Sequence, residues 1–209
     1  VLFSAPQLVN QEKIPGKLGF ATTSADLNGD GLEEAIFSAP QFPVNHRPAA
    51  GEVYIFYGDP TKPGTPARKG TTIDLAITEG GVTPHGETRV QGPARAQIGF
   101  SLATGDVDGD GFEDLIIGAP FAAREGGDAP GMATIIFGQP NLPGNPAGSG
   151  SIVDLTQAAG TFGETTIFGP DGGAKLGFSV AAGDVNGDGI QDVVMGAPDA
   201  DGPSVEETG

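Results

Sequence analysis

The hydrophobic positions of the chain fall into short apolar runs, and glycine, proline and acidic residues separate these runs from one another. The runs "DLIIGAP" (114–120) and "DVVMGAP" (192–198) are continuously apolar and rich in β-branched residues, which is typical of strands buried on both faces. With 36 Gly and 18 Pro, the chain favours turns over long helices. The pattern therefore predicts an all-β fold of many short strands.

These runs belong to a repeat. Three stretches align without gaps: "LGFATTSADLNGDGLEEAIFSAP" (18–40), "IGFSLATGDVDGDGFEDLIIGAP" (98–120) and "LGFSVAAGDVNGDGIQDVVMGAP" (176–198). Each contains Gly-Phe, an acidic nonapeptide, an apolar run and Ala-Pro, and successive copies are offset by 80 and 78 residues. Similarity at a steady period is the signature of a repeat architecture.

The intervening segments also correspond to one another. The matched pairs are 51–58 with 131–138, 71–76 with 151–156, and 87–100 with 164–178. Each unit then has two strands around the acidic loop, a third and a fourth strand, and a short extra strand at 71–76 or 151–156. Four antiparallel strands repeated radially predict the blades of a β-propeller. An array of separate small β domains is the alternative, but one such unit has little core of its own.

The whole chain, 1–209, is expected to be one propeller segment. Its predicted parts are the end of a preceding blade (1–17), two blades (18–97 and 98–175) and the start of a further blade (176–209). "VLFSAP" at the start resembles the Ala-Pro end of an earlier unit, yet only 34 residues separate Ala5 from Ala39. Either that unit is degenerate or a stretch is missing. Because a propeller has about four or more blades, we expect the chain to be part of a longer propeller.

The three nonapeptides, "DLNGDGLEE", "DVDGDGFED" and "DVNGDGIQD", carry oxygen side chains at positions 1, 3, 5 and 9 and Gly at position 6. Calcium prefers about six to eight oxygen ligands, and a backbone carbonyl at position 7 can add one more. The pattern predicts about three Ca²⁺ ions in the blade hairpins, although hairpin turns of Asp, Asn and Gly also form without metal. The expected ligands are Asp26, Asn28, Asp30, Leu32 and Glu34; Asp106, Asp108, Asp110, Phe112 and Asp114; and Asp184, Asn186, Asp188, Ile190 and Asp192.

The loops begin like an EF-hand but do not end like one. An EF-hand needs a bidentate Glu at position 12, where this chain has Phe37, Ile117 and Met195. Those residues belong to predicted strands, and the flanking segments are also strand-like. We therefore expect calcium loops with a structural role, without EF-hand helices. Magnesium suits these loops less well because it prefers octahedral sites rich in water.

Charge and residue usage exclude several functions. The net charge is −17, from 27 acidic and 10 basic residues, which argues against nucleic acid or an anionic membrane as a partner. No apolar run approaches the roughly 18 residues of a transmembrane helix. The two histidines, His46 and His85, lie in variable loops, and neither G-x-S-x-G nor H-E-x-x-H occurs. We therefore expect no catalytic site in this segment, whether or not the parent protein is an enzyme.

These residues resemble the FG-GAP repeat. Gly99-Phe100 with Gly118-Ala119-Pro120, and Gly177-Phe178 with Gly196-Ala197-Pro198, fit its name, whereas the first copy has Ser38 before Ala39-Pro40. The family's calcium pattern, D-x-[DN]-x-D-G-x-x-D, matches all three loops, with Glu34 in place of the last Asp. The resemblance implies the seven-bladed propeller of integrin α-subunit heads. Similar repeats form the non-catalytic C-terminal part of glycosylphosphatidylinositol-specific phospholipase D.

Three functional hypotheses follow. The first is an extracellular or cell-surface binding or adhesion module that takes a protein or glycan ligand on its propeller loops. The second is the propeller of a phospholipase D-like hydrolase, in contact with the remaining blades or the catalytic domain. The third is a structural propeller of a filament or matrix. In each case, Phe20, Phe100 and Phe178 are expected to pack in the core between neighbouring blades.

Overall fold

The computed structural model describes residues 3–4, 16–58, 73–75, 87–140, 142, 151–157 and 163–201. Every helix or strand in that part of the chain is a β-strand, which confirms the all-β prediction, and no helix there could cross a membrane. His85 and the loop 59–70 lie outside the described residues. The strands are β1 (Phe3–Ser4), β2 (Thr22–Ala25), β3 (Glu34–Ala39), β4 (Glu52–Phe56), β5 (Ile73–Asp74), β6 (Thr88–Gln91), β7 (Ser101–Gly105), β8 (Asp114–Ala119), β9 (Met132–Ile136), β10 (Ser151–Asp154), β11 (Glu164–Phe168), β12 (Ser179–Gly183) and β13 (Asp192–Gly196).

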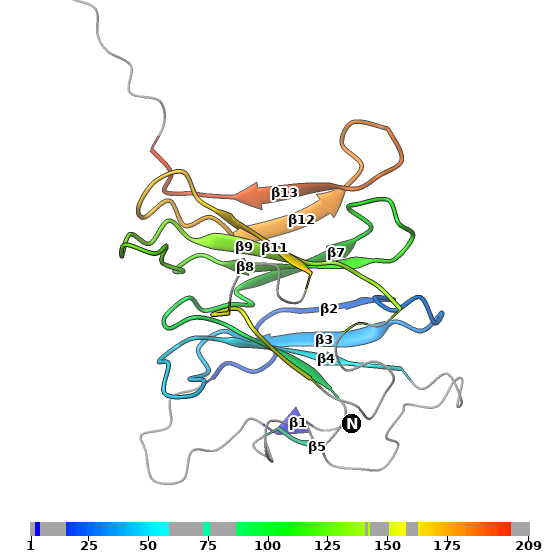
Figure 1. Ribbon diagram of the computed structural model, residues 1–209, viewed down its shortest axis with the longest axis horizontal. Helices are drawn as coiled ribbons and strands as arrows, with labels where there is room; N and C mark the ends of the chain where they lie inside the picture. Colours follow the sequence, from blue (N-terminus) through cyan, green and yellow to red (C-terminus); the bar gives the residue numbers. More distant parts are fainter. Residues whose placement is uncertain are drawn as a thin grey trace, which may run out of the picture.

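The strands form propeller blades. In blade 1, β2, β3, β4 and β6 pair in sequence as antiparallel neighbours, and β7, β8, β9 and β11 do the same in blade 2. The described part of blade 3 is the hairpin β12–β13. Figure 1 shows these sheets stacked face to face in sequence order, with the small β1–β5 sheet beyond blade 1. The four-stranded antiparallel blades confirm the predicted architecture.

A continuous hydrophobic core joins blades 1 and 2. Val53, Ile55 and Val90 of blade 1 belong to the same buried cluster as Leu115 and Ile117 of blade 2. All six residues of β8 are buried, as its unbroken apolar pattern predicts. Each such aliphatic side chain contributes roughly 1.5–3 kcal/mol when it is fully buried, so contact between blades supplies much of the stability of each sheet.

An aromatic line crosses all three blades. The ring centroids of Phe20 and Phe100 are 5.2 Å apart, those of Phe100 and Phe178 are 5.0 Å apart, and Phe121 meets Phe100 edge-on at 6.0 Å. The predicted contact between neighbouring blades is therefore confirmed. The prediction that these phenylalanines pack in the core is wrong, because Phe20 and Phe178 are 44% and 43% exposed. The line lies at the surface and holds the blades together there.

Strand β10 links the blades in a way that the sequence does not indicate. It lies between the third and fourth strands of blade 2 in the chain, yet it pairs in parallel with β6 of blade 1, with Val153 opposite Val90. Blade 1 thereby gains a fifth strand from the following repeat. Strand β10 of blade 2 thus covers the outer edge of blade 1, and this β10–β6 contact is called the clasp below.

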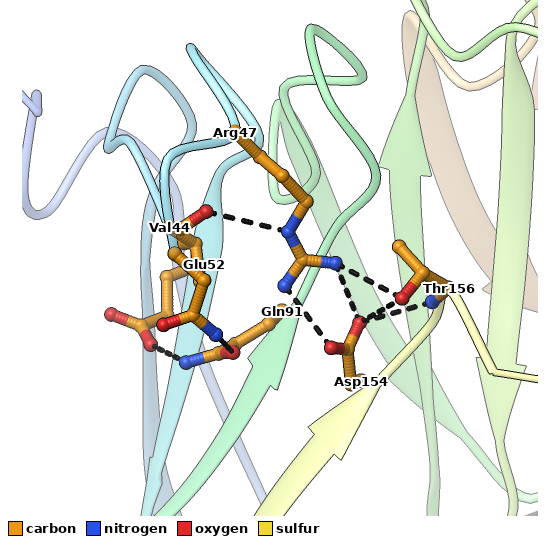
Figure 2. A network of polar contacts seen from close by, with 7 residues as sticks. Val44, Arg47, Glu52, Gln91, Asp154 and Thr156 are labelled. Atoms are coloured by element: carbon orange, nitrogen blue, oxygen red, sulfur yellow. Dashed lines mark hydrogen bonds and ion pairs between the residues drawn. The ribbon is translucent and has the colours of Figure 1, made fainter.

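Arg47 fastens this clasp from the turn between β3 and β4, as Figure 2 shows. Its Nη1 and Nη2 donate to the two carboxylate oxygens of Asp154 at 2.7 and 3.2 Å, and its Nε donates to the Val44 carbonyl. Thr156 donates to Asp154 Oδ1, the oxygen that Arg47 Nη1 also contacts, through its backbone N–H at 3.1 Å and its hydroxyl at 2.8 Å. Beside this network, Gln91 donates to the buried Glu52 at 2.7 Å, and burial raises the Glu52 pKa.

The start of the chain forms the short strand β1. β1 pairs in parallel with β5, with Phe3 opposite Ile73, just as β6 pairs with β10. In the aligned repeats Ile73 corresponds to Val153, so Phe3 corresponds to Val90 in a fourth strand and not to an Ala-Pro strand. A fourth strand at this place is compatible with the short spacing to Ala39, and both interpretations of that spacing stay predictions.

Candidate metal sites

The three acidic loops connect the first two strands of each blade. They span residues 26–33 between β2 and β3, 106–113 between β7 and β8, and 184–191 between β12 and β13. Figure 1 shows all three at the same end of the stacked sheets. The register of each hairpin brings position 1 close to position 9, since Gly105 is opposite Asp114 and Gly183 is opposite Asp192. The fold therefore gathers the predicted ligands of each loop.

Each loop folds around the carboxylate at position 1. In the second loop, Asp106 accepts hydrogen bonds from the backbone N–H groups of Gly109 and Gly111 at 2.7 and 3.0 Å. The side chains at positions 3 and 5 each cap a backbone N–H two residues later: Asp108 accepts from Asp110, and Asp110 accepts from Phe112. These are turns of the Asx type. A carboxylate has about four lone-pair sites, so such turns leave oxygen capacity for a cation.

The other two loops repeat this arrangement. Asp26 accepts from Gly31 at 2.8 Å, and Asp184 accepts from Gly189 at 2.9 Å. The amide oxygens of the two asparagines at position 3 accept from the position 5 N–H at 2.9 and 2.8 Å. Glycine at position 6 has φ of 85°, 92° and 92° in the three loops, a left-handed conformation that favours residues without a Cβ. The sequence pattern therefore encodes one loop conformation three times.

The acid at position 9 ties the loop to the sheet. Asp114 is fully buried and accepts from the N–H groups of Val107 at 2.7 Å and Gly138 at 2.8 Å, so it joins the loop to the segment just beyond the end of β9. Glu34 is also buried and accepts from Leu27 at 2.8 Å. Burial raises the pKa of Glu34 to about 7, and the nearby charges of Asp30 and Asp26 add to this shift against the Leu27 hydrogen bond. Burial likewise raises the Asp114 pKa.

The second loop fits a calcium ion in size and chemistry. One carboxylate oxygen from each of Asp106, Asp108 and Asp114 lies within 4.8 Å of the others. Opposite oxygens around Ca²⁺, at about 2.3–2.6 Å from the ion each, would be separated by a similar distance. A cation there would also offset the charges of Asp108 and Asp110, which add to the effect of burial on the pKa of Asp114. The donors are hard oxygens only, as calcium requires.

Some predicted ligands are not brought into this cluster. Asp110, at position 5, is not one of its three members and instead caps the Phe112 N–H. The first and third loops share the turn geometry, but they have Asn28 and Asn186 where the second loop has the acid Asp108. The carbonyls of Leu32, Phe112 and Ile190 stay predicted ligands. The loop geometry is thus compatible with the complete ligand sets, which stay predictions.

Sequence reasoning missed position 8 altogether. Glu113 is not a predicted ligand of its own loop, yet its carboxylate accepts a hydrogen bond from the backbone N–H of Asp26 in the neighbouring blade at 2.8 Å. The sequence feature that reflects this contact is a long polar side chain at position 8 in all three copies: Glu33, Glu113 and Gln191. It could not be interpreted without knowing which loops lie side by side.

Comparisons with known proteins agree with this geometry. The FG-GAP repeat model matches residues 18–56, 98–136 and 176–209, more than half of the chain. Phosphatidylinositol-glycan-specific phospholipase D of Bos taurus is 32% identical over 188 residues, which are 89% of this chain and 19% of that protein. Integrin alpha pat-2 of Caenorhabditis briggsae is 30% identical over 183 residues, 87% of this chain and 12% of that protein. The chain thus spans less than a fifth of either relative.

Proposed function

The chain belongs to the FG-GAP repeat family, and from that premise we propose that it is a calcium-stabilised propeller segment that acts as an extracellular or cell-surface binding or adhesion module. The observation that carries the calcium proposal is the cluster of Asp106, Asp108 and Asp114 around a loop that its own turns already shape. Calcium would be structural, because each ion would neutralise a loop whose like charges oppose folding. The likeness to integrin α chains supports the adhesion role.

The remaining blades are the expected partner of blade 3. Val194 on β13 is 50% exposed, whereas Ile36 and Ile116 at the same repeat position are buried under the following blade. Because the equivalent positions of blades 1 and 2 are buried, the exposure of Val194 favours a face that another element covers. We propose that further repeats of the parent protein cover it and complete a propeller, seven-bladed as in integrin α heads. The protein or glycan ligand would then bind to loops of the complete propeller.

The experiment that tests the calcium proposal compares thermal unfolding in calcium and in EDTA. A ligand that binds only the folded state stabilises it by about 2.7 kcal/mol per site at a free concentration 100 times its Kd, so chelation should lower the melting temperature clearly. Magnesium at the same concentration is the control and should restore much less. An unchanged melting temperature in EDTA would contradict calcium as the structural cation.

The second candidate is the non-catalytic propeller of a phospholipase D-like hydrolase. The 32% identity to the bovine phosphatidylinositol-glycan-specific phospholipase D favours it. Both candidates need the same calcium-stabilised propeller, and they differ in what precedes it in the parent protein. Sequencing the parent gene upstream of the codon for Val1 separates them. A His-rich zinc hydrolase domain there would favour the hydrolase, and further FG-GAP repeats without such a domain would favour the adhesion module.

A further inference from the structure

Neighbouring acidic loops are in direct contact. Glu113, at position 8 of the second loop, accepts from the Asp26 N–H at 2.8 Å, and its own N–H donates to the Asp26 carbonyl at 3.4 Å. Asp26 is the residue around which the first loop folds, since its carboxylate accepts from Asp30 and Gly31. Glu113 therefore holds both backbone polar groups of the first predicted ligand in the preceding blade.

The contact recurs one blade further along. The backbone N–H of Gln191, at position 8 of the third loop, donates to the Asp106 carbonyl at 3.0 Å. Asp106 is again position 1 of the preceding loop. The same pair of positions meets twice, so the contact follows from the way the blades stack and not from one local accident.

A second contact joins the same loops. A Cβ placed on Gly29, at position 4 of the first loop, would lie 2.9 Å from Phe112 Cδ1 and nearer still to Cε1. The side chain at position 7 thus covers the preceding loop, and Ile190 lies over Gly109 in the same way. In the third loop, Gly187 has nothing within 4 Å of its Cβ position among the described residues. Each loop is covered only where another follows it.

We propose that Glu113 is a positioning residue for the calcium site of the first loop, and that the first and second sites therefore bind calcium with positive coupling. This inference rests on the proposed calcium binding. Glu113 stands between Phe112 and Asp114, two predicted ligands of the second loop. An ion in that loop would fix both neighbours of Glu113, and Glu113 would then hold Asp26 in place. Coupling between two sites is reciprocal, so an ion in the first loop would favour binding in the second to the same extent.

The coupling is tested with the full chain and calcium as the probe. Calcium is titrated at constant ionic strength, and the amide signals of Gly31, Gly111 and Gly189 in nitrogen-15 NMR spectra report each loop separately. Glu113→Ala should weaken the first loop about tenfold, since a hydrogen bond to a charged group is worth roughly 1.5 kcal/mol. Glu33→Ala is the matched control: Glu33 is also at position 8 but accepts from Ser24 of its own hairpin, so all three affinities should stay unchanged.

Two further variants distinguish the effect of the length of the Glu113 side chain from the effect of its charge. Glu113→Gln keeps the length and has a neutral acceptor oxygen, so it should retain most of the affinity of the first loop. Glu113→Asp keeps the charge but is one methylene shorter, and should weaken it as Ala does. This pair also answers the question if Glu113→Ala fails to fold. If Glu113→Asp binds normally and Glu113→Gln does not, the effect is one of charge alone and the positioning role is overturned.

A double-mutant cycle measures the coupling itself. Asp108→Ala disables the second loop and should lower the affinity of the first loop about tenfold, but it should have no further effect there once Glu113 is Ala. If Asp108→Ala leaves the first loop unchanged, the coupling is overturned while calcium binding stands. If the wild-type chain binds no calcium in any loop, the proposed function and this inference fail together.

Discussion

The contact between Phe112 and Gly29 can be tested without calcium, by comparing Gly29→Ala with Gly187→Ala. Both glycines are at position 4 of their loops, and both have a left-handed backbone, with φ of 72° and 81°. An alanine in that conformation costs roughly 1 kcal/mol, and this cost is common to the two variants. Only Gly29 lies under a ring, because the Cβ of an alanine there would come 2.9 Å from Phe112 Cδ1 and nearer to Cε1.

The ring has to move to accept that methyl group, and overpacking of this kind typically adds about 1–3 kcal/mol. We therefore expect Gly29→Ala to lower the free energy of unfolding by about 2–4 kcal/mol and Gly187→Ala by about 1 kcal/mol. Urea unfolding followed by far-ultraviolet circular dichroism, in EDTA, measures both. EDTA removes any contribution of calcium, so the difference reports the contact between the loops.

A third variant makes the comparison independent of blade 3. In a Phe112→Ala background the space above Gly29 is empty, so Gly29→Ala should then cost only the backbone term of roughly 1 kcal/mol. Equal losses for Gly29→Ala and Gly187→Ala, together with no relief in the Phe112→Ala background, would refute the packing of one loop on the next. The coupling inferred for the calcium sites would then lose one of its two contacts.

Two other predictions concern the clasp and the aromatic line. Burial alone would raise the pKa of Asp154, but hydrogen bonds from Arg47 and Thr156 and the charge of Arg47 together lower it. The pair therefore stabilises the fold fully above the pKa of the unfolded carboxyl and loses this contribution as the pH falls through the lower pKa of the folded state. Urea unfolding at neutral pH should show that the free energy of unfolding of the wild type is about 1 kcal/mol higher than that of Asp154→Asn. At acidic pH this difference should be smaller. A difference that stays constant with pH would contradict the stabilising role of the ion pair. Phe100→Ala, which removes three ring contacts, should cost about 2–3 kcal/mol and more than Phe178→Ala, which removes one; equal losses in thermal unfolding would show that the line contributes little.

Sequence reasoning succeeded where the information is local and repeated. The nonapeptide fixes its own turns, since Asp106 and its equivalents accept from glycines three to five residues away. The apolar runs around it predict the paired strands for the same reason. Three copies in one register turn each weak local preference into a specific expectation, and the blade arrangement follows from them.

What the sequence did not indicate is how distant segments pair. Nothing in "SIVDLT" says that β10 pairs with the preceding blade, because a parallel edge pairing depends on backbone groups that every residue carries. The strand Phe3–Ser4 has only two residues, so its sequence does not distinguish a fourth strand from the Ala-Pro strand that it also resembles. Glu113 acts outside its own loop, so its role needs the distance to Asp26, a residue 87 positions earlier in the chain.

Two of the contacts between blades, the one between acidic loops and the one made by Arg47 and Asp154, lie at opposite ends of the sheets. The acidic loops follow the first strand of each blade, whereas Arg47 lies in the turn after the second strand, at the other end (Figure 1), where it binds Asp154 at the end of β10. The clasp is complete within the protein, because Arg47 and Asp154 neutralise each other. The loop end is not: the charges of Asp30 and Asp26 add to the rise in the pKa of Glu34 that burial mainly causes. A cation at that end would therefore regulate how firmly neighbouring blades are held, while the clasp keeps them in register whether or not a cation is bound.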